Sequence, residues 1–335
     1  TYPDYTSVID SGRRFTWAET QKRCIRLASA LEKRGIGKGN TVSVMAPNVT
    51  AAFEATFGVP MRGAILNALN YRLNATEIAF ILDHGECKLL ITDTEFSSII
   101  EEALEFVAHR PIVVDIDDPN GPGGKSLGEI NYEAFLESGD EDHHWSCPDN
   151  EWNAISLNYT SGTTGNPKGV VYSHRGTYLN AVGNIMSWHM PAHPVYLWTL
   201  PMFHCNGWCF PWSITAIAGT HVCLRSVIAK DIYGAIADHK VTHMCGAPIV
   251  MQLIAGASEE DKQDLPHMVN MFTAAAPPPA TVLADMARAG FNVTHVYGLT
   301  EVLGPCVISA WKFEWDELSL DEQARLKARQ GVAYT

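Results

Sequence analysis

Runs of apolar and β-branched residues alternate along the chain with longer stretches in which apolar residues recur every three or four positions. The short runs are typical of buried strands, and the longer stretches are typical of amphipathic helices. Strands are expected at residues 41–45, 64–69, 88–92, 111–115, 195–200, 222–224, 242–245, 269–273 and 293–297, with a further apolar run at 154–159. Helices are expected at residues 16–33, 50–62, 75–82, 96–108, 228–239, 279–288 and 314–329. The alternation predicts an α/β fold of stacked, mostly parallel sheets with flanking helices.

Local signals mark the ends of several helices. Thr16 precedes the first amphipathic stretch and Glu19 stands three residues later, a spacing typical of a capping box. Gly35 and Gly85 follow two of the helical stretches, as glycines do when they end a helix in the left-handed conformation.

The length and a change in composition predict two lobes. A chain of 335 residues is too long for one small core. Residues 116–151 are rich in glycine, proline and acidic side chains, which is typical of a long surface connection. We therefore expect a first α/β lobe at residues 1–150 that ends in this connection, and a second α/β lobe at residues 151–335.

Composition and charge restrict the classes of function. The chain is 46% hydrophobic and 18% charged, its eight cysteines lack disulfide spacing, and neither a signal peptide nor an 18-residue apolar window is visible. We expect a cytoplasmic protein without a membrane span. The net charge of −13 disfavours nucleic-acid partners and repels nucleotides as well, so any nucleotide site must rely on local donors. Arg13, Arg14, Lys22, Arg23 and Arg26 are interpreted as a solvated helix face.

The most informative stretch is 159–169, YTSGTTGNPKG, which follows the apolar run 154–159. Four hydroxyls, three glycines and Lys168 fall within ten residues of one another. Glycines allow a close approach of backbone N–H groups to a ligand, and hydroxyls and lysine can donate to phosphate oxygens. The spacing is not that of a P-loop, and no Gly-x-Gly-x-x-Gly follows an early strand. The alternative is a flexible surface turn.

Two other segments further along the chain carry short motifs of their own. Residues 201–204 read PMFH and residues 297–301 read YGLTE. Together, and in this order, the three segments resemble the signatures of the acyl-adenylate-forming superfamily, which includes acyl-CoA synthetases, peptide-synthetase adenylation domains and firefly luciferase. The run 201–212, PMFHCNGWCFPW, is most similar to acyl-CoA synthetases that use short, medium or aromatic carboxylates.

The resemblance implies a reaction in two halves. A carboxylic acid reacts with ATP to give an acyl-adenylate and pyrophosphate, and the thiol of coenzyme A then displaces AMP to give a thioester. ATP, Mg²⁺ and coenzyme A are the implied cofactor and substrates. Because three phosphates must be neutralised during the first half, positioned donors and a metal ion should dominate its catalysis.

The resemblance also implies roles for individual residues. The catalytic candidates are Lys168, His204, Thr300 and Glu301. The ATP- and AMP-binding candidates are Thr160, Ser161, Gly162, Thr163, Thr164, Gly165, Lys168, Ala275, Ala276, Pro277, Tyr297, Gly298, Leu299 and Thr300. The candidates for the acyl pocket are His204, Trp208, Phe210, Gly246, Ala247 and Pro248. Magnesium, which prefers oxygen ligands, is assigned to Thr164 and Glu301.

Several of these residues have a second interpretation. His204 is expected to orient the substrate rather than to act as a general base, because a carboxylate is already ionised at neutral pH; a hydrogen-bonded core histidine is the alternative. Ala275 stands where many relatives carry glycine, and a positive φ is costly for alanine. Aromatic wall residues are as often plain core packing as a substrate pocket. Zinc binding by His204, Cys205 and Cys209 is disfavoured, because no Cys-x-x-Cys pair is present.

The implied activity leaves alternatives open. Members of the family continue past the position of residue 335, so we expect most of a large N-terminal domain without the C-terminal domain, with weak nucleotide binding and little turnover. A phosphotransferase or ATPase would release phosphate rather than pyrophosphate. A nucleotide-binding module without turnover and another adenylate-forming ligase are further alternatives. Large relatives are often dimers, which makes a homodimer an expectation.

Overall fold

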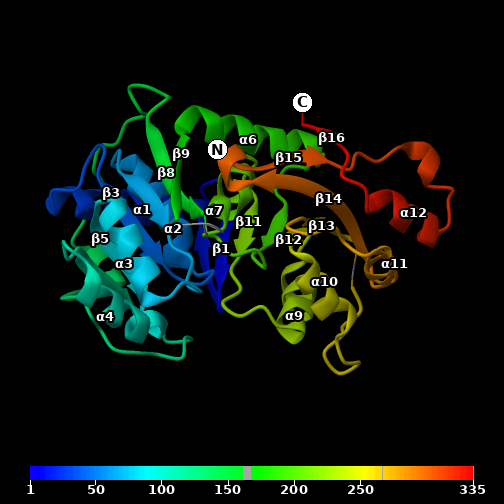
Figure 1. Ribbon diagram of the computed structural model, residues 1–335, viewed down its shortest axis with the longest axis horizontal. Helices are drawn as coiled ribbons and strands as arrows, with labels where there is room; N and C mark the ends of the chain where they lie inside the picture. The colour runs from blue at the N-terminus through cyan, green and yellow to red at the C-terminus, as the bar shows by residue number, and fades with distance from the viewer. Residues whose placement is uncertain (161–166, 266, 335) are drawn as a thin grey trace.

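The computed structural model describes residues 1–160, 167–265 and 267–334, which form two sheets with helices on their faces (Figure 1). The first sheet has the order β16 (Val332–Ala333), β15 (Gly304–Ile308), β14 (Phe291–Leu299), β13 (Val269–Thr273), β12 (His243–Gly246), β10 (Val195–Leu197), β11 (Thr220–Val222), β1 (Thr6–Asp10) and β2 (Arg13–Thr16). The second has the order β7 (Ile130–Asn131), β6 (Ile112–Ile116), β5 (Cys87–Asp93), β3 (Thr41–Met45), β4 (Ile65–Ala68), β8 (Ala154–Thr160) and β9 (Lys168–Ser173).

Most neighbouring strands run parallel, so the predicted α/β fold class is confirmed. The antiparallel pairs are β1–β2, β14–β15 and β15–β16 in the first sheet and β8–β9 in the second. Strands from both sides of residue 150 share each sheet: β1 and β2 join the first sheet, and β8 and β9 join the second. The division into lobes at residue 150 stays a prediction.

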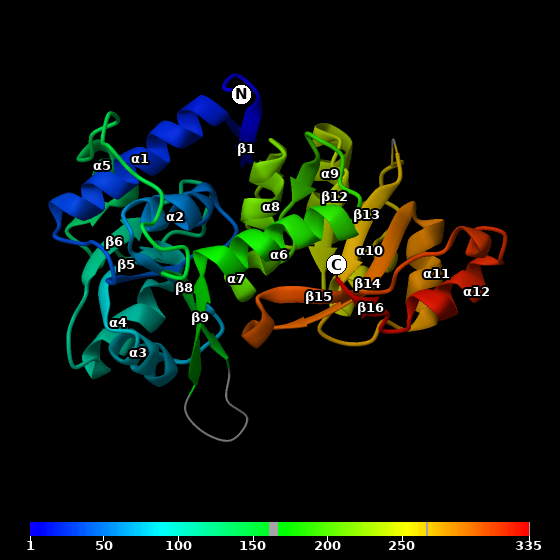
Figure 2. The ribbon, with the colours of Figure 1, turned by 90° about the horizontal axis from the view of Figure 1, so that it is seen from above.

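The helices form three layers around the two sheets (Figure 2). They are α1 (Trp17–Lys33), α2 (Thr50–Met61), α3 (Ala75–His84), α4 (Ser97–Phe106), α5 (Tyr132–Glu137), α6 (His174–Ser187), α7 (Cys205–Trp208), α8 (Phe210–Ala216), α9 (Ala229–His239), α10 (Pro248–Ala255), α11 (Ala280–Arg288) and α12 (Leu320–Lys327). One core cluster joins α3 and α4 to the second sheet, and another joins α9, α10 and α11 to the first. The remaining clusters fill the middle layer, where α2 contributes Val59 to one and Phe53 to the other.

Most predicted helix ends are confirmed. Thr16 and Glu19 form the expected capping box of α1, and Gly35 follows that helix at φ +75°. Gly85 is the C-cap of α3, as expected, but it lies at φ −81°, and Glu86 takes the left-handed conformation instead. The helix expected at residues 314–329 is shortened to Leu320–Lys327, because Ser319 and Glu322 form a capping box of their own and begin the helix there.

The solvated interpretation of Arg23 is wrong. Its guanidinium is mostly buried, contacts the fully buried carboxylate of Glu54 on α2, and also donates to Glu133 at 2.8 Å. The hydroxyl of Tyr132 donates to the same Glu54 carboxylate at 2.9 Å. A buried charge needs such partners, because desolvation alone would cost several kcal/mol, roughly.

Arg225 connects the two sheets. It follows β11 of the first sheet and donates to Asp93 at 2.8 Å, to Asp118 at 2.9 Å and to Glu95 at 2.9 Å. The three carboxylates belong to chain segments at the ends of β5 and β6 in the second sheet. Asp93 and Asp118 are buried, so this ion-pair cluster lies inside the contact between the two halves.

No helix in the described part of the chain combines the length and the apolar character needed to cross a membrane.

Candidate active site

A cavity of about 770 Å³ opens where the two sheets meet. The carboxyl ends of β10, β12, β13 and β14 contribute its wall, together with segments that follow β3, β4 and β11. Ligands of open parallel sheets bind at this end of the strands. Predicted site residues from four separate segments line the cavity: His204, Trp208, Gly246, Ala247, Ala275, Gly298, Leu299 and Thr300.

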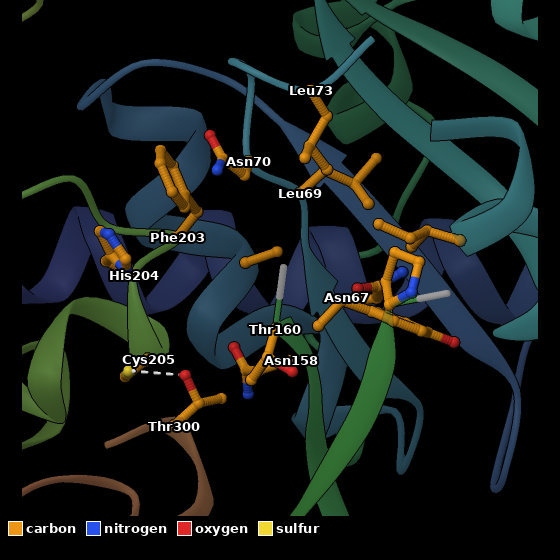
Figure 3. Close-up of a pocket in the computed structure, with 14 residues that line it drawn as sticks. Asn67, Leu69, Asn70, Leu73, Asn158, Thr160, Phe203, His204, Cys205 and Thr300 are labelled. Atoms are coloured by element: carbon orange, nitrogen blue, oxygen red, sulfur yellow. Dashed lines mark hydrogen bonds between the residues drawn. The ribbon is translucent and has the colours of Figure 1, made fainter. Parts of the chain in front are cut away.

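A smaller cavity of about 150 Å³ lies at the base of the β8–β9 hairpin (Figure 3). Asn158, Thr160 and Pro167 line it from the hairpin, and Figure 3 shows Cys205 and Thr300 beside them. His204, Cys205 and Thr300 line both cavities. These three residues therefore join the hairpin that carries the glycine-rich stretch to the larger cavity.

The segment labelled α7 is a left-handed turn. Cys205, Asn206, Gly207, Trp208 and Cys209 have φ values between 44° and 65°. Left-handed conformations cost about 1–2 kcal/mol for each non-glycine residue and normally occur singly. At Gly207 a Cβ atom would stand 2.7 Å from Trp198, so the glycine is required on steric grounds as well. The turn directs two side chains, those of Cys205 and Trp208, to the cavity wall.

His204 precedes this turn as an exposed residue, and the ring of Phe203 stacks on its imidazole at 5.3 Å between centroids. Desolvation by the atoms around the ring, reinforced by the charge of Arg72, lowers the pKa of His204. The imidazole is therefore neutral at pH 7 and can donate one N–H and accept one hydrogen bond. This state suits an orienting group, as expected from the sequence.

Ala275 lies at φ +78° in the cavity wall. The positive φ considered from the sequence is therefore present. An alanine is strained in this conformation, whereas a glycine adopts it freely. The sharp bend brings the backbone after β13 to the cavity.

We expect Ala275→Gly to raise the free energy of unfolding by up to about 1 kcal/mol, because relief of the left-handed strain exceeds the added entropy of the unfolded chain. Urea unfolding measures the change. Ala276→Gly is the matched control, because Ala276 has no positive φ and should lose about 0.5–1 kcal/mol. Equal effects of both substitutions would contradict the strain.

Other predicted site residues lie outside these two cavities. Phe210 is fully buried and stacks on Tyr196 at 5.2 Å, so it belongs to the core of the first sheet. Pro248 begins α10. Tyr297, on β14, is 42% exposed, and Ala276, Pro277, Lys168 and Glu301 are also exposed. Lys168 pairs with Thr160 across the β8–β9 hairpin. Ser161, Gly162, Thr163, Thr164 and Gly165 lie outside the described residues.

Several cavity residues were missed from the sequence, among them four with polar side chains. Asn48, Tyr71, Arg72 and Arg225 follow β3, β4 and β11. Asn48 donates to the carbonyl oxygens of Trp198 at 2.8 Å and Leu200 at 3.1 Å, which bends the chain after β10 and ends that strand before residue 200. The signal that could have found them is their position directly after predicted parallel strands.

The cavity is locally favourable to an anion although the chain carries a net charge of −13. Arg72 and Arg225 line it, and no aspartate or glutamate is found among its described lining residues. Arg225 has three carboxylate partners, whose charge exceeds its own, so the positive charge on the cavity wall comes from Arg72. A negative ligand would therefore be favoured at the Arg72 side of the cavity and disfavoured near the Arg225 cluster.

Of the two residues expected to bind Mg²⁺, Glu301 is among the residues that the structure describes and Thr164 is not. Glu301 is exposed and follows Thr300, which lines both cavities, although Glu301 itself is not among the lining residues of either. Mg²⁺ is commonly held by one or two carboxylates together with substrate phosphates and water. A single carboxylate beside an anion cavity fits that donor set. Within the described ranges, no group of three or more His, Cys, Asp or Glu side chains could hold a metal by itself.

Comparison with known proteins identifies similar sequences. Residues 1–334 match the family model described as AMP-binding enzyme. The chain is 49% identical to a peroxisomal acetate/butyrate–CoA ligase of Arabidopsis thaliana, with 100% of the chain and 61% of that relative covered. It is 50% identical to an acetate–CoA ligase of Humulus lupulus, with 99% and 61% covered. The chain thus spans 61% of the length of these curated relatives.

A solved structure shares the fold. The N-terminal domain of FACL13 from Mycobacterium tuberculosis, in an inhibitor-bound crystal, superimposes with a TM-score of 0.85 at 23% identity. The comparison covers 100% of this chain and 79% of that one. The predicted fold, an N-terminal domain of the adenylate-forming type, is confirmed.

The expected cytoplasmic location is wrong. The Arabidopsis acetate/butyrate–CoA ligase and a trans-cinnamate:CoA ligase of Petunia hybrida, 44% identical to this chain, are both named as peroxisomal. These relatives point to the peroxisome. The expectation rested on the lack of a visible leader and on the spacing of cysteines, and neither feature distinguishes two compartments that both hold unpaired thiols.

Proposed function

Because the chain belongs to the AMP-binding enzyme family, we propose that the protein is an ATP-dependent acyl-CoA synthetase that activates a short- or medium-chain fatty acid or an aryl acid. The observation that carries the proposal is the single cavity of about 770 Å³ that collects residues from the 201–204 and 297–301 signatures, next to the hairpin of the third signature. The names of the relatives, which include acetate, butyrate, 2-methylpropanoate and trans-cinnamate ligases, support this class of substrate.

In the first half-reaction a carboxylate oxygen of the acid bonds to the α-phosphorus of ATP, and the bond from that phosphorus to the pyrophosphate oxygen breaks. We assign the β- and γ-phosphates to the hairpin residues Thr160–Lys168. Thr300, which lines both cavities, would donate to the α-phosphate. Such donors stabilise charge that develops on the equatorial oxygens.

In the second half-reaction the thiol of coenzyme A loses its proton to solvent, its sulfur bonds to the acyl carbon, and AMP leaves with the electron pair of the broken C–O bond. The neutral His204 beside the cavity would orient the acyl group in both halves. Ala275 and Tyr297 would hold adenine, the first from the cavity wall and the second from its exposed position on β14.

Magnesium would be held by Glu301, with Thr164 as a second candidate, and it would neutralise phosphate charge when bound. The protein's own contribution would be the Glu301 carboxylate, which directly follows Thr300 in the wall of both cavities. A homodimer stays a prediction.

The proposal is tested by incubating the full-length protein with ATP, Mg²⁺ and acids of graded chain length, and by measuring pyrophosphate release with and without coenzyme A. Acid-dependent pyrophosphate and AMP are the expected products. Phosphate release without dependence on an acid would favour an ATPase. Nucleotide binding without any product would favour a non-enzymatic nucleotide-binding module. This module is the second candidate, because the chain spans only 61% of the length of the relative.

Trp208 is proposed to limit the length of the acid. Trp208 is a lining residue of the cavity, and its backbone is held in place by the left-handed turn and by Gly304, where an added Cβ would stand 3.2 Å from the Trp208 Cα. Gly246 lines the same cavity without a side chain. A bulky wall beside a glycine leaves room for a short acid and excludes a long one.

We expect Trp208→Ala to raise kcat/KM for hexanoate and octanoate relative to butyrate by about tenfold or more, because each methylene buried in an apolar pocket contributes roughly 1–3 kcal/mol. Pyrophosphate release across the acid series measures the shift. Trp152→Ala removes a 68% exposed indole and should leave the acid preference unchanged. An unchanged preference in the Trp208 variant would remove this residue from the acyl pocket.

A further inference from the structure

The turn at residues 300–305 is held from behind by buried side chains that belong to other elements. The hydroxyl of Tyr172 donates to the backbone oxygen of Thr300 at 2.6 Å. The thiol of Cys209 donates to the backbone oxygen of Leu303 at 3.3 Å, and the amide of Asn180 donates to that of Pro305 at 2.9 Å. Three successive parts of the turn are thereby fixed.

Of these contacts, the one made by Tyr172 joins two signatures. Tyr172 lies on β9, four residues after Lys168, and β9 forms the second arm of the hairpin that carries the glycine-rich stretch. Thr300 begins the short helical turn Thr300–Val302, which carries Glu301. The hydrogen bond therefore ties a strand of the second sheet to a turn of the first, next to both cavities.

The environment of the Tyr172 hydroxyl makes it a fixed donor. Tyr172 is 2% exposed, and burial, with smaller contributions from the thiols of Cys205 and Cys209, raises the pKa of its phenol. The phenol is therefore protonated at neutral pH and can donate its hydrogen. Tyr172 lines neither cavity, so it does not meet a ligand itself.

The side chain of Thr300 is fixed as well. Its Oγ1 lies 3.4 Å from the Sγ of Cys205, a contact drawn in Figure 3. The backbone bond from Tyr172 and the side-chain contact from Cys205 together leave Thr300 little freedom. Glu301, the next residue, extends into solvent from a backbone that is held on both sides, at Thr300 and at Leu303.

We propose that Tyr172 is a positioning residue that sets the distance between the phosphate-binding hairpin and the Thr300–Glu301 turn. This inference rests on the proposed function, because it gives the two tied segments their roles: one holds the phosphate tail, and the other holds the α-phosphate and the metal. Loss of the bond would let the Glu301 carboxylate drift relative to the phosphates. Small displacements of this kind are costly, because catalysis of phosphoryl and nucleotidyl transfer is mostly positioning.

The test compares Tyr172→Phe with Tyr132→Phe in the full-length protein. Both remove only a hydroxyl from a tyrosine that is 2% exposed, and Tyr132 donates to Glu54 at 2.9 Å, within the network around Arg23. We expect Tyr172→Phe to lower kcat for pyrophosphate release about tenfold, the equivalent of one hydrogen bond, and to raise the Mg²⁺ concentration at half-maximal rate. KM for the acid should stay unchanged. Tyr132→Phe should lower Tm without altering kcat or the Mg²⁺ dependence.

A second readout is independent of activity. Amide hydrogen exchange in residues 300–304 should become faster in Tyr172→Phe and stay as in the wild type in Tyr132→Phe, because only the first variant releases the turn. Wild-type kinetics together with unchanged exchange in Tyr172→Phe would overturn the inference. If the wild type released no pyrophosphate with any acid, the proposed function would fail, while the exchange data would still decide whether Tyr172 holds the turn.

Discussion

Exchange of Glu301 for glutamine is expected to slow acid-dependent pyrophosphate release by about a hundredfold or more. The substitution keeps the shape of the side chain and removes its charge, so it weakens the hold on a divalent cation that neutralises the phosphates. Loss of one well-placed electrostatic group in an active site commonly lowers kcat by about 10²–10³. Glu301 is exposed, so the fold should tolerate the change.

The measurement is pyrophosphate release over a series of Mg²⁺ concentrations. The expected profile for Glu301→Gln has a lower maximal rate and requires more Mg²⁺. Glu317→Gln is the matched control, because Glu317 is an exposed glutamate outside both cavities. A Glu301 variant with the rate and the Mg²⁺ dependence of the wild type would exclude this residue from the metal site.

Exchange of Arg225 for methionine is expected to lower the free energy of unfolding by about 3–5 kcal/mol, the usual cost of removing one partner from a buried ion pair. Asp93 and Asp118 are almost fully buried and would lose their shared counter-charge. Methionine keeps much of the apolar volume of the arginine stem, so the loss reports on the charge rather than on packing.

Chemical denaturation measures this loss, and Arg175→Met provides the comparison. Arg175 pairs with Glu151 between side chains that are 44% and 57% exposed. Exposed pairs contribute less than about 1 kcal/mol, so the control should unfold nearly as the wild type does. Similar losses of unfolding free energy in both variants would show that the buried cluster between the sheets stabilises the fold no more than an exposed ion pair does.

Strands with uninterrupted apolar runs could be predicted from the sequence, because parallel strands buried on both faces have no polar side. Residues 41–45 and 269–273 coincide with β3 and β13. The middle-layer helix α6 was missed. Its buried positions are occupied by small or polar residues, and it carries Gly176 and Gly183. It therefore lacks the regular amphipathic pattern of a surface helix.

The candidate site was predicted in part. Motif residues such as His204 and Thr300 could be named in advance, and the structure brings both to the same two cavities. Phe210 and Trp208 could not be separated, because both are aromatic and only two positions apart. Both belong to the same core cluster, and only Trp208, within the left-handed turn, also lines the cavity; no local pattern of apolar residues encodes that handedness.

Tyr172 and Arg225 escaped prediction for a different reason. Each acts through partners more than a hundred residues away along the chain. A single tyrosine in a strand or a single arginine after one carries no signal of such a partner. Only the packing of the two sheets against each other reveals the pairings.

The left-handed turn at Cys205–Cys209 also constrains the order in which the molecule assembles. Four of its five residues are not glycine, and each costs about 1–2 kcal/mol in this conformation, a total comparable with the entire net stability of a typical domain. A free peptide of this sequence would not adopt it. We therefore expect the wall that presents His204 and Trp208 to form only once the surrounding core holds the turn in place, and to be lost early when that core loosens.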